Sequence, residues 1–183
     1  MTPSSMSDVR LEVSAGALLA FGAAWYLDSS GFVTAALPAM AVHEAGHAAV
    51  LRLTGSRVTR VRLTLSGLVM DYDGRLGRRQ MLLTALAGPT LGAAYGAACL
   101  QTGSAFLRMS GTASLLLTAV NLLPMLPLDG GRAAACAIGE SSAATVSKAV
   151  SLMLLAAALC ALITLRTPLP LIFAAAGVVW NFR

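Results

Sequence analysis

The stretch that decides the fold is residues 31–51, GFVTAALPAMAVHEAGHAAVL, an apolar run that carries HEAGH at positions 43–47. A helix of about 20 apolar residues is long enough to cross the hydrocarbon core of a bilayer. Side chains four residues apart lie on the same face of a helix, so His43 and His47 point to the same side. The stretch therefore predicts a membrane helix with two imidazoles next to each other.

The composition of the whole chain is typical of a membrane protein. Of its 183 residues, 57% are hydrophobic and 11% are charged, a balance far outside that of water-soluble domains. We expect residues 1–183 to form a single integral-membrane domain, because this length does not accommodate a membrane region and a separate soluble domain of usual size. The net charge of the chain is +5. Its basic residues lie between apolar runs, where they are typical of cytoplasmic loops of a membrane protein rather than of a nucleic-acid-binding surface.

Six apolar segments follow one another along the chain, and we expect about six transmembrane helices. They are residues 11–27, 31–51, 81–100, 111–123, 149–165 and 168–181. Several are shorter than the ~20 residues that a straight crossing needs, which suggests helices broken within the membrane or a locally thinned bilayer. The first segment could instead be a signal peptide, although Arg10 is the only cation before it and no small-residue cleavage site follows.

The distribution of arginines predicts the orientation in the membrane. Residues 52–80 contain seven of them, so the positive-inside rule places this stretch in the cytoplasm. With six crossings, both termini are then cytoplasmic, and only Arg108 and Arg166 lie on the opposite side. HEAGH lies toward the arginine-rich end of its segment, so we expect the site that it forms to open to the cytoplasm.

Between the second and third apolar segments, residues 58–72 (VTRVRLTLSGLVMDY) alternate between apolar and polar side chains. This period of two predicts a strand, and Gly67 can turn the chain so that a second strand returns. The expected fold is therefore an all-α membrane protein with a short β-hairpin at the cytoplasmic membrane surface. Asp71 and Asp73 are interpreted as the polar end of this hairpin rather than as cation ligands.

The HEAGH residues have the spacing of a zinc site. His43 and His47 are the only histidines of the chain. Zinc accepts imidazole nitrogen, and a catalytic site needs a third protein ligand and one open position for water. Glu44 lies beside the same helix face, where its carboxylate can act as a general base. Stray polar residues on a core helix are a poor alternative, because an unpaired ionised Glu within a membrane helix costs about 3 kcal/mol.

A second stretch with polar residues, 121–132 (NLLPMLPLDGGR), begins at the end of the fourth apolar segment. Pro124 and Pro127 must break the helix, and broken backbone at membrane depth survives only where it is buried in protein or lines a wet cavity. We predict that Asp129 is the third ligand of one Zn²⁺ per chain, its alternative role being a helix N-cap. Asn121 is predicted to bond the substrate backbone or the developing oxyanion, or else to pack as an amide between helices.

Two sets of small residues are interpreted as packing features. Gly88, Gly92 and Gly96 recur every four residues in the third apolar segment, a spacing that lets helices approach closely. The three cysteines, at positions 99, 136 and 160, show no pair at zinc-ligand or redox spacing. We expect all three to be small buried apolar residues.

Together, HEAGH and NLLPMLPLDGGR resemble the site-2 protease family of intramembrane zinc metalloproteases, in particular its small six-span branch, which includes a sporulation protease that activates a sigma-factor precursor. The sequence Ala87-Gly88-Pro89 also resembles a family feature. The resemblance implies hydrolysis of a peptide bond within or next to a transmembrane segment of a membrane-bound substrate. It also implies the residue roles already named: ligands His43, His47 and Asp129, base Glu44, and Asn121 near the scissile bond.

The resemblance further implies partners and a location. The partners are a membrane-protein substrate, such as a membrane-associated transcription-factor precursor or an anti-sigma factor, regulatory membrane proteins and the lipid bilayer, but not nucleic acid. The location is the cell membrane, with several crossings. An edge of the hairpin could hold an unwound substrate by strand addition.

Two other functional classes stay open from the residues alone. A membrane metal-transport protein would need further ligands along a path, and the chain has no third histidine. A metal-binding or inactive scaffold of the same fold would have no need of Glu44. The metal itself is inferred from ligand chemistry, since iron, cobalt or manganese fit similar ligands.

Overall fold

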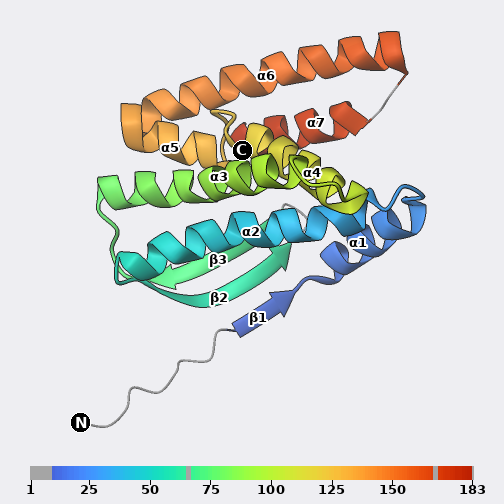
Figure 1. Ribbon diagram of the computed structural model, residues 1–183. Coiled ribbons are helices and arrows are strands. Elements are labelled where there is room, and N and C mark those ends of the chain that lie inside the picture. The colour runs from blue at the N-terminus through green and yellow to red at the C-terminus, as the bar shows by residue number, and fades with distance from the viewer. Residues whose placement is uncertain (1–9, 65–66, 167–168, 183) are drawn as a thin grey trace.

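The computed structural model describes residues 10–64, 67–166 and 169–182, which form seven helices and three strands (Figure 1). In chain order these are β1 (Arg10–Val13), α1 (Ala15–Leu27), α2 (Phe32–Leu53), β2 (Arg57–Thr64), β3 (Gly67–Asp73), α3 (Arg78–Leu100), α4 (Ala105–Asn121), α5 (Asp129–Ile138), α6 (Glu140–Leu165) and α7 (Leu169–Asn181). The chain is mostly helical, as its apolar pattern predicts, with one small sheet.

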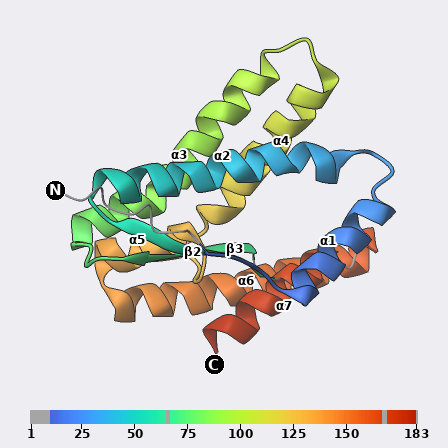
Figure 2. The same ribbon diagram turned by 90° about the horizontal axis from the view of Figure 1, so that it is seen from below.

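The predicted hairpin is confirmed. β2 and β3 pair antiparallel, with Val61 opposite Met70. Gly67, at which the sequence predicts the turn, is the first residue of β3 and lies opposite Thr64, and residues 65–66 lie outside the described residues. Asp71 binds the Arg62 guanidinium at 2.9 Å, which confirms its structural role in the hairpin. The sheet lies alongside α2, at one border of the helical bundle (Figure 1, Figure 2).

Strand β1, which the sequence did not predict, corrects the prediction for the first apolar segment. Residues 11–13 are a strand that pairs parallel with β2, Leu11 lying opposite Val61, and α1 begins only at Ala15. Pairing satisfies backbone groups along an edge of β2 that would otherwise be open. Ser14 then starts the helix, because its Oγ accepts a hydrogen bond from the Ala17 N–H at 3.2 Å.

Helices α2, α3 and α4 pack against one another through small residues. A Cβ added at Gly46 of α2 would lie 2.5 Å from the Ala87 carbonyl oxygen of α3. One added at Gly96 of α3 would lie 3.0 Å from the Gly111 carbonyl oxygen of α4. These helices therefore touch backbone to backbone, and the predicted packing role of the glycine stripe is confirmed for Gly96.

The six predicted membrane spans are not established by the structure. Among the described residues, two helices are long and apolar enough to cross a membrane, Arg78–Leu100 and Glu140–Thr164, and α1 and α7 are shorter apolar helices. Predicted segment 111–123 is only the later part of α4, which starts at Ala105 because the Ser104 side chain caps it. Residues 129–138 form α5, a helix that the apolar pattern did not predict.

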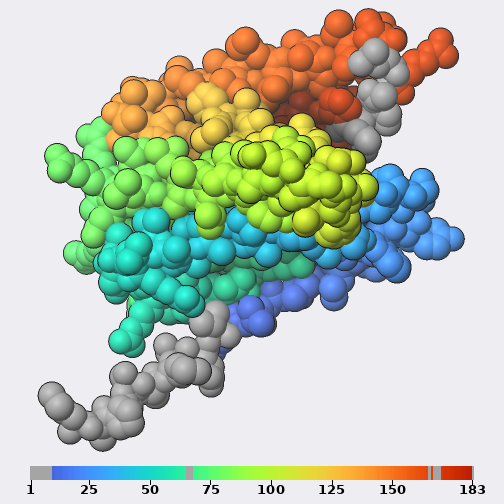
Figure 3. All heavy atoms as spheres, in the orientation of Figure 1, coloured from blue at the N-terminus to red at the C-terminus, as the bar shows by residue number. Residues whose placement is uncertain are grey.

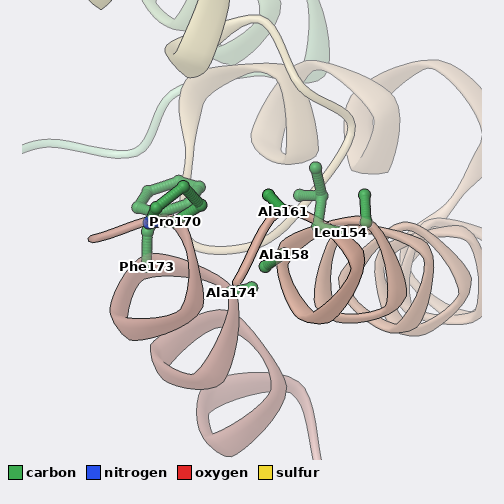
Figure 4. A pocket seen from close by; sticks show the side chains of 7 residues that line it. Leu154, Ala158, Ala161, Pro170, Phe173 and Ala174 are labelled. Atoms are coloured by element: carbon green, nitrogen blue, oxygen red, sulfur yellow. The ribbon is translucent and has the colours of Figure 1, made fainter. Parts of the chain in front are cut away.

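The α6–α7 pair forms the border of the molecule opposite the sheet (Figure 3). Helices α2, α3 and α4 lie between the sheet and this pair (Figure 1, Figure 3). Between the two helices of the pair lies an apolar hollow of ≈ 270 Å³, open to the surface and lined by Leu154, Phe173 and neighbouring alanines (Figure 4). None of its lining residues is ionisable, so this hollow is separate from the polar residues singled out in the sequence. The prediction for the cysteines is wrong at one position: Cys99 and Cys136 are buried, but Cys160 of α6 is exposed.

Candidate metal centre

The three predicted ligands meet at one point. His43 and His47 lie one turn apart on α2, and their Nε2 atoms are 3.2 Å apart. The Asp129 carboxylate comes from the first residue of α5, and its Oδ2 lies 3.1 Å from His43 Nε2 and 3.2 Å from His47 Nε2. Residues 86 positions apart in the sequence therefore form a nearly equilateral triangle of ligand atoms.

The size of this triangle fits a zinc ion. Zinc–nitrogen and zinc–oxygen bonds of about 2.0–2.1 Å in a tetrahedral site place ligand atoms about 3.3 Å from one another. The observed separations of 3.1–3.2 Å match this value without movement of any side chain. Two imidazoles and one carboxylate also leave one tetrahedral position for water.

The second ring nitrogen of His47 indicates a cation at the centre of the triangle. His47 Nδ1 lies 2.7 Å from the Thr84 carbonyl oxygen, which can only accept, so Nδ1 carries the hydrogen. In the neutral ring, Nε2 then presents a lone pair toward the Asp129 carboxylate, which also offers only lone pairs. Two such atoms 3.2 Å apart repel unless a metal ion or a proton lies between them. A bond like that to Thr84 is the outer contact that orients histidines in metal sites.

His43 is more deeply buried, with 3% of its surface exposed. Its Nδ1 has no hydrogen-bond partner within the described part of the chain. A Cβ added at Gly92 would lie 3.6 Å from this nitrogen and 2.9 Å from the Thr118 hydroxyl oxygen, so a side chain at position 92 would clash with Thr118.

Gly88 shows that packing is not the whole role of the glycine stripe. A Cβ at this position would lie 2.2 Å from His47 Nε2 and 2.6 Å from its Cε1. The imidazole therefore occupies the space that only a glycine leaves free. The sequence interpretation of Gly88 as a helix-packing residue is incomplete, because Gly88 also determines where a ligand can stand.

Two further glycines hold Asp129 in place. Added Cβ atoms would lie 2.3 Å from the Leu122 carbonyl oxygen at Gly130 and 2.5 Å from the Met125 carbonyl carbon at Gly131. The loop of residues 122–128 is therefore folded directly onto the start of α5. The alternative reading of Asp129 as an N-cap is wrong, since Leu128 holds that position and the Asp129 carboxylate faces the histidines.

The two remaining predicted site residues are placed differently. Glu44 is half-buried and close enough to both histidines and Asp129 for their charges to interact. Asn121 ends α4, and its Nδ2 donates to the Leu117 carbonyl of the same helix at 3.0 Å. That bond is neither the predicted contact across the bundle nor a free donor for substrate, so the role of Asn121 in binding stays a prediction.

Comparisons with known proteins give the context of this geometry. Residues 68–165 match the family model described as "Peptidase family M50". This region includes Asp129 and starts after HEAGH. A curated relative is "Putative zinc metalloprotease Rip3" of Mycobacterium tuberculosis, in strains Erdman and H37Rv, at 36% identity over 121 residues. That alignment covers 59% of this chain and 30% of the relative, so the chain spans less than a third of its length.

A solved structure agrees in fold. The site-2 protease from Methanocaldococcus jannaschii superposes with a TM-score of 0.69 at 21% identity, over 94% of this chain and 90% of that chain. An identity this low shows a shared fold alone. Membership rests instead on the family model, which matches more than half of the chain. The chain thus belongs to peptidase family M50, the site-2 protease family of membrane zinc metalloproteases.

Proposed function

We propose that this chain is an intramembrane zinc endopeptidase that cuts a peptide bond within or next to a transmembrane segment of a membrane-bound substrate. The observation that carries the proposal is the 3.1–3.2 Å triangle of His43 Nε2, His47 Nε2 and Asp129 Oδ2, with Glu44 beside it. We infer one Zn²⁺ per chain, because the described residues hold one group of three such ligands within 4.8 Å of one another. A metal-transport protein would need several such groups of ligands along the path of the ion.

Each residue then has a chemical role. When bound, zinc supplies Lewis-acid polarisation of the scissile carbonyl and activates water at its open position. Glu44 accepts the proton of the attacking water and delivers it to the leaving nitrogen. Asn121 turns its amide away from Leu117 to donate to the carbonyl oxygen of the substrate, where negative charge develops. Thr84 keeps the His47 ring in the required tautomer throughout.

The proposed orientation has the site open to the cytoplasm and both termini on that side of a multi-pass protein. Exposed arginines gather where α2 ends, β2 begins and α3 begins: Arg52, Arg57, Arg75 and Arg79. The positive-inside rule assigns such a cluster to the cytoplasm. HEAGH lies in the half of α2 that leads to this end, so water has the shorter route from there.

The sheet is the proposed guide for the substrate. A transmembrane helix hides its carbonyl groups in hydrogen bonds, so the segment to be cut must first unwind. In the order β1-β2-β3, one side of β2 is already covered by β1, so the hairpin offers the outer edge of β3, Gly67–Asp73. An extended segment can add there through main-chain hydrogen bonds. Membrane-bound transcription-factor precursors and anti-sigma factors, under control of regulatory membrane partners, are the proposed substrate class.

Cleavage in sealed vesicles tests both the activity and the orientation. The purified protein is co-reconstituted with single-span candidate substrates, and the products are mapped by mass spectrometry. We expect a cut within or next to the spanning segment, abolished by a membrane-permeant zinc chelator in every vesicle. Cuts confined to soluble loops, or cleavage that persists after zinc removal, would overturn the proposed function.

The sidedness of inhibition locates the opening. EDTA does not cross bilayers, so we expect it to stop cleavage in inside-out vesicles, where the cytoplasmic face is outside, and to leave right-side-out vesicles active. An N-terminal tag should be digested by added protease only in the inside-out preparation. Inhibition of right-side-out vesicles alone would contradict a cytoplasmic opening while leaving the protease activity intact.

A further inference from the structure

We infer that Ser147 of α6 and Asn181 of α7 are positioning residues for the metal centre, acting on Asp129 through the backbone of Leu126. The inference rests on the proposed zinc site. Neither residue touches the three ligands. Both instead hold the loop of residues 122–128, which delivers Asp129 to the histidines.

The two side chains clamp one residue of the loop. The Leu126 N–H donates to Ser147 Oγ at 2.7 Å, and the Leu126 carbonyl oxygen accepts from Asn181 Nδ2 at 2.9 Å. Leu126 lies outside any helix, between Pro124 and Pro127, so no helical ladder satisfies its backbone groups. Within a membrane protein, such groups must find partners inside the protein. Ser147 and Asn181 are those partners.

The clamp is itself held in a fixed orientation. Ser147 Oγ donates to Asn181 Oδ1, and Asn181 Nδ2 also donates to the Gly177 carbonyl oxygen at 2.9 Å. Ser151 adds a hydroxyl 3.1 Å from Asn181 Nδ2. Ser147 and Ser151 have no exposed surface and Asn181 is half-buried, so water has little access to these bonds. A buried network in which every member is satisfied is rigid and specifies one arrangement.

Tight packing carries this rigidity from Leu126 to Asp129. A Cβ at Gly131 would lie 2.6 Å from Leu126 N, so the first turn of α5 rests directly on the clamped peptide. Met125 next to it is 2% exposed, and a Cβ at Gly177 would lie 2.9 Å from its Sδ. The loop therefore cannot shift alone. Movement of Leu126 moves the residue that starts α5, which is Asp129.

A purely structural role would give a different result from a positioning role. If the network only joined α6 to α7, its loss would lower the thermal stability of the protein and leave the affinity for zinc unchanged. If it positions Asp129, its loss weakens zinc binding and changes the ligand field of a Co²⁺ probe. Metal affinity and the Co²⁺ spectrum are therefore measured together with thermal unfolding of the metal-free protein.

The decisive variant is Ser147→Ala, a small change that removes both hydrogen bonds of the hydroxyl. Loss of a direct outer contact to a metal ligand costs about 10–100-fold in metal affinity. Ser147 acts on Asp129 only through Leu126, so we expect a loss at the lower end of this range, about 10-fold, by competition with a chromophoric chelator. The visible bands of the Co²⁺ protein should weaken or shift. Thr145→Val is the matched control, because among the described residues the Thr145 hydroxyl bonds only the Ser141 carbonyl of the same helix, at 3.1 Å.

Asn181→Asp is the second variant, and it covers the case in which Ser147→Ala does not fold. It keeps the oxygen that accepts from Ser147 but loses the donor to Leu126, so zinc affinity should again fall. Wild-type zinc affinity and an unchanged Co²⁺ spectrum in a folded variant would overturn the positioning role. Failure of the wild-type protein itself to bind zinc would instead refute the proposed function on which the inference depends.

Discussion

Replacement of Glu44 by glutamine is expected to lower kcat for substrate cleavage by about 10²–10⁴-fold, the usual contribution of a general acid–base group. Glutamine has nearly the size and shape of glutamate, so the packing of α2 is preserved, but its amide cannot accept the proton of water. His43, His47 and Asp129 are untouched, and the variant should keep its zinc. The measurement is the cleavage rate in vesicles together with the zinc content of the same preparation.

Glu140→Gln is the matched control for this experiment. Glu140 is exposed in the first turn of α6, so the same loss of one carboxylate there should leave cleavage unchanged. Cleavage by Glu44→Gln at the wild-type rate would remove Glu44 from its proposed role. Loss of zinc in that variant would show that Glu44 is a ligand rather than a base.

Gly88→Ala is expected to weaken zinc binding by about 100-fold or more, because it displaces one of the three ligands rather than an outer contact. The new methyl carbon would stand 2.2 Å from His47 Nε2, far closer than van der Waals contact allows. Separation of α2 from α3 would instead break their close packing at Gly46 and the Ala87 carbonyl. The imidazole must therefore turn away from the metal, and from its bond to Thr84.

The matched control is Gly22→Ala, because Gly22 of α1 has no heavy atom within 4 Å of an added Cβ. Its methyl group should leave zinc affinity unchanged. Affinity is measured by chelator competition, and thermal unfolding of the metal-free proteins shows whether either substitution disturbs the fold. Wild-type affinity in Gly88→Ala would mean that His47 is not held where the structure places it.

The ligand triangle could be predicted from the sequence because its chemistry is distinctive. Two histidines four residues apart in an apolar helix have few explanations, and a carboxylate beside two prolines and two glycines needs a partner at membrane depth. Packing around the triangle could not be predicted in the same way. Gly88 looks like any glycine of a packing stripe, and only the distance to His47 shows that it limits a ligand.

Ser147 and Asn181 were missed for a related reason. A serine within an apolar helix usually bonds the carbonyl of its own preceding turn, as the Ser151 hydroxyl does to Ser147. The pattern of the sequence does not say which serine instead bonds a loop 21 residues away. Asn181, at the end of its helix, would have been the better signal, because an amide that ends an apolar segment needs partners.

The fold shows the same division between local and long-range information. Alternation predicts the hairpin of β2 and β3, since its strands are neighbours in the sequence, but β1 pairs with a strand about 50 residues later, which no local pattern reveals. The helix that carries the site is a special case. Among the described helices, only α3 and α6 are both long and apolar enough to cross a membrane. α2 has 22 residues, but His43, Glu44 and His47 lower its mean hydropathy.

X-ray absorption at the zinc edge, on wild-type protein purified in detergent, tests the central claim most directly. The triangle of His43, His47 and Asp129 predicts one zinc per chain, bound by nitrogen and oxygen atoms at about 2.0–2.2 Å with the scattering pattern of two imidazoles. Absence of stoichiometric zinc, a sulfur ligand at about 2.3 Å, or a spectrum with no imidazole contribution would contradict it.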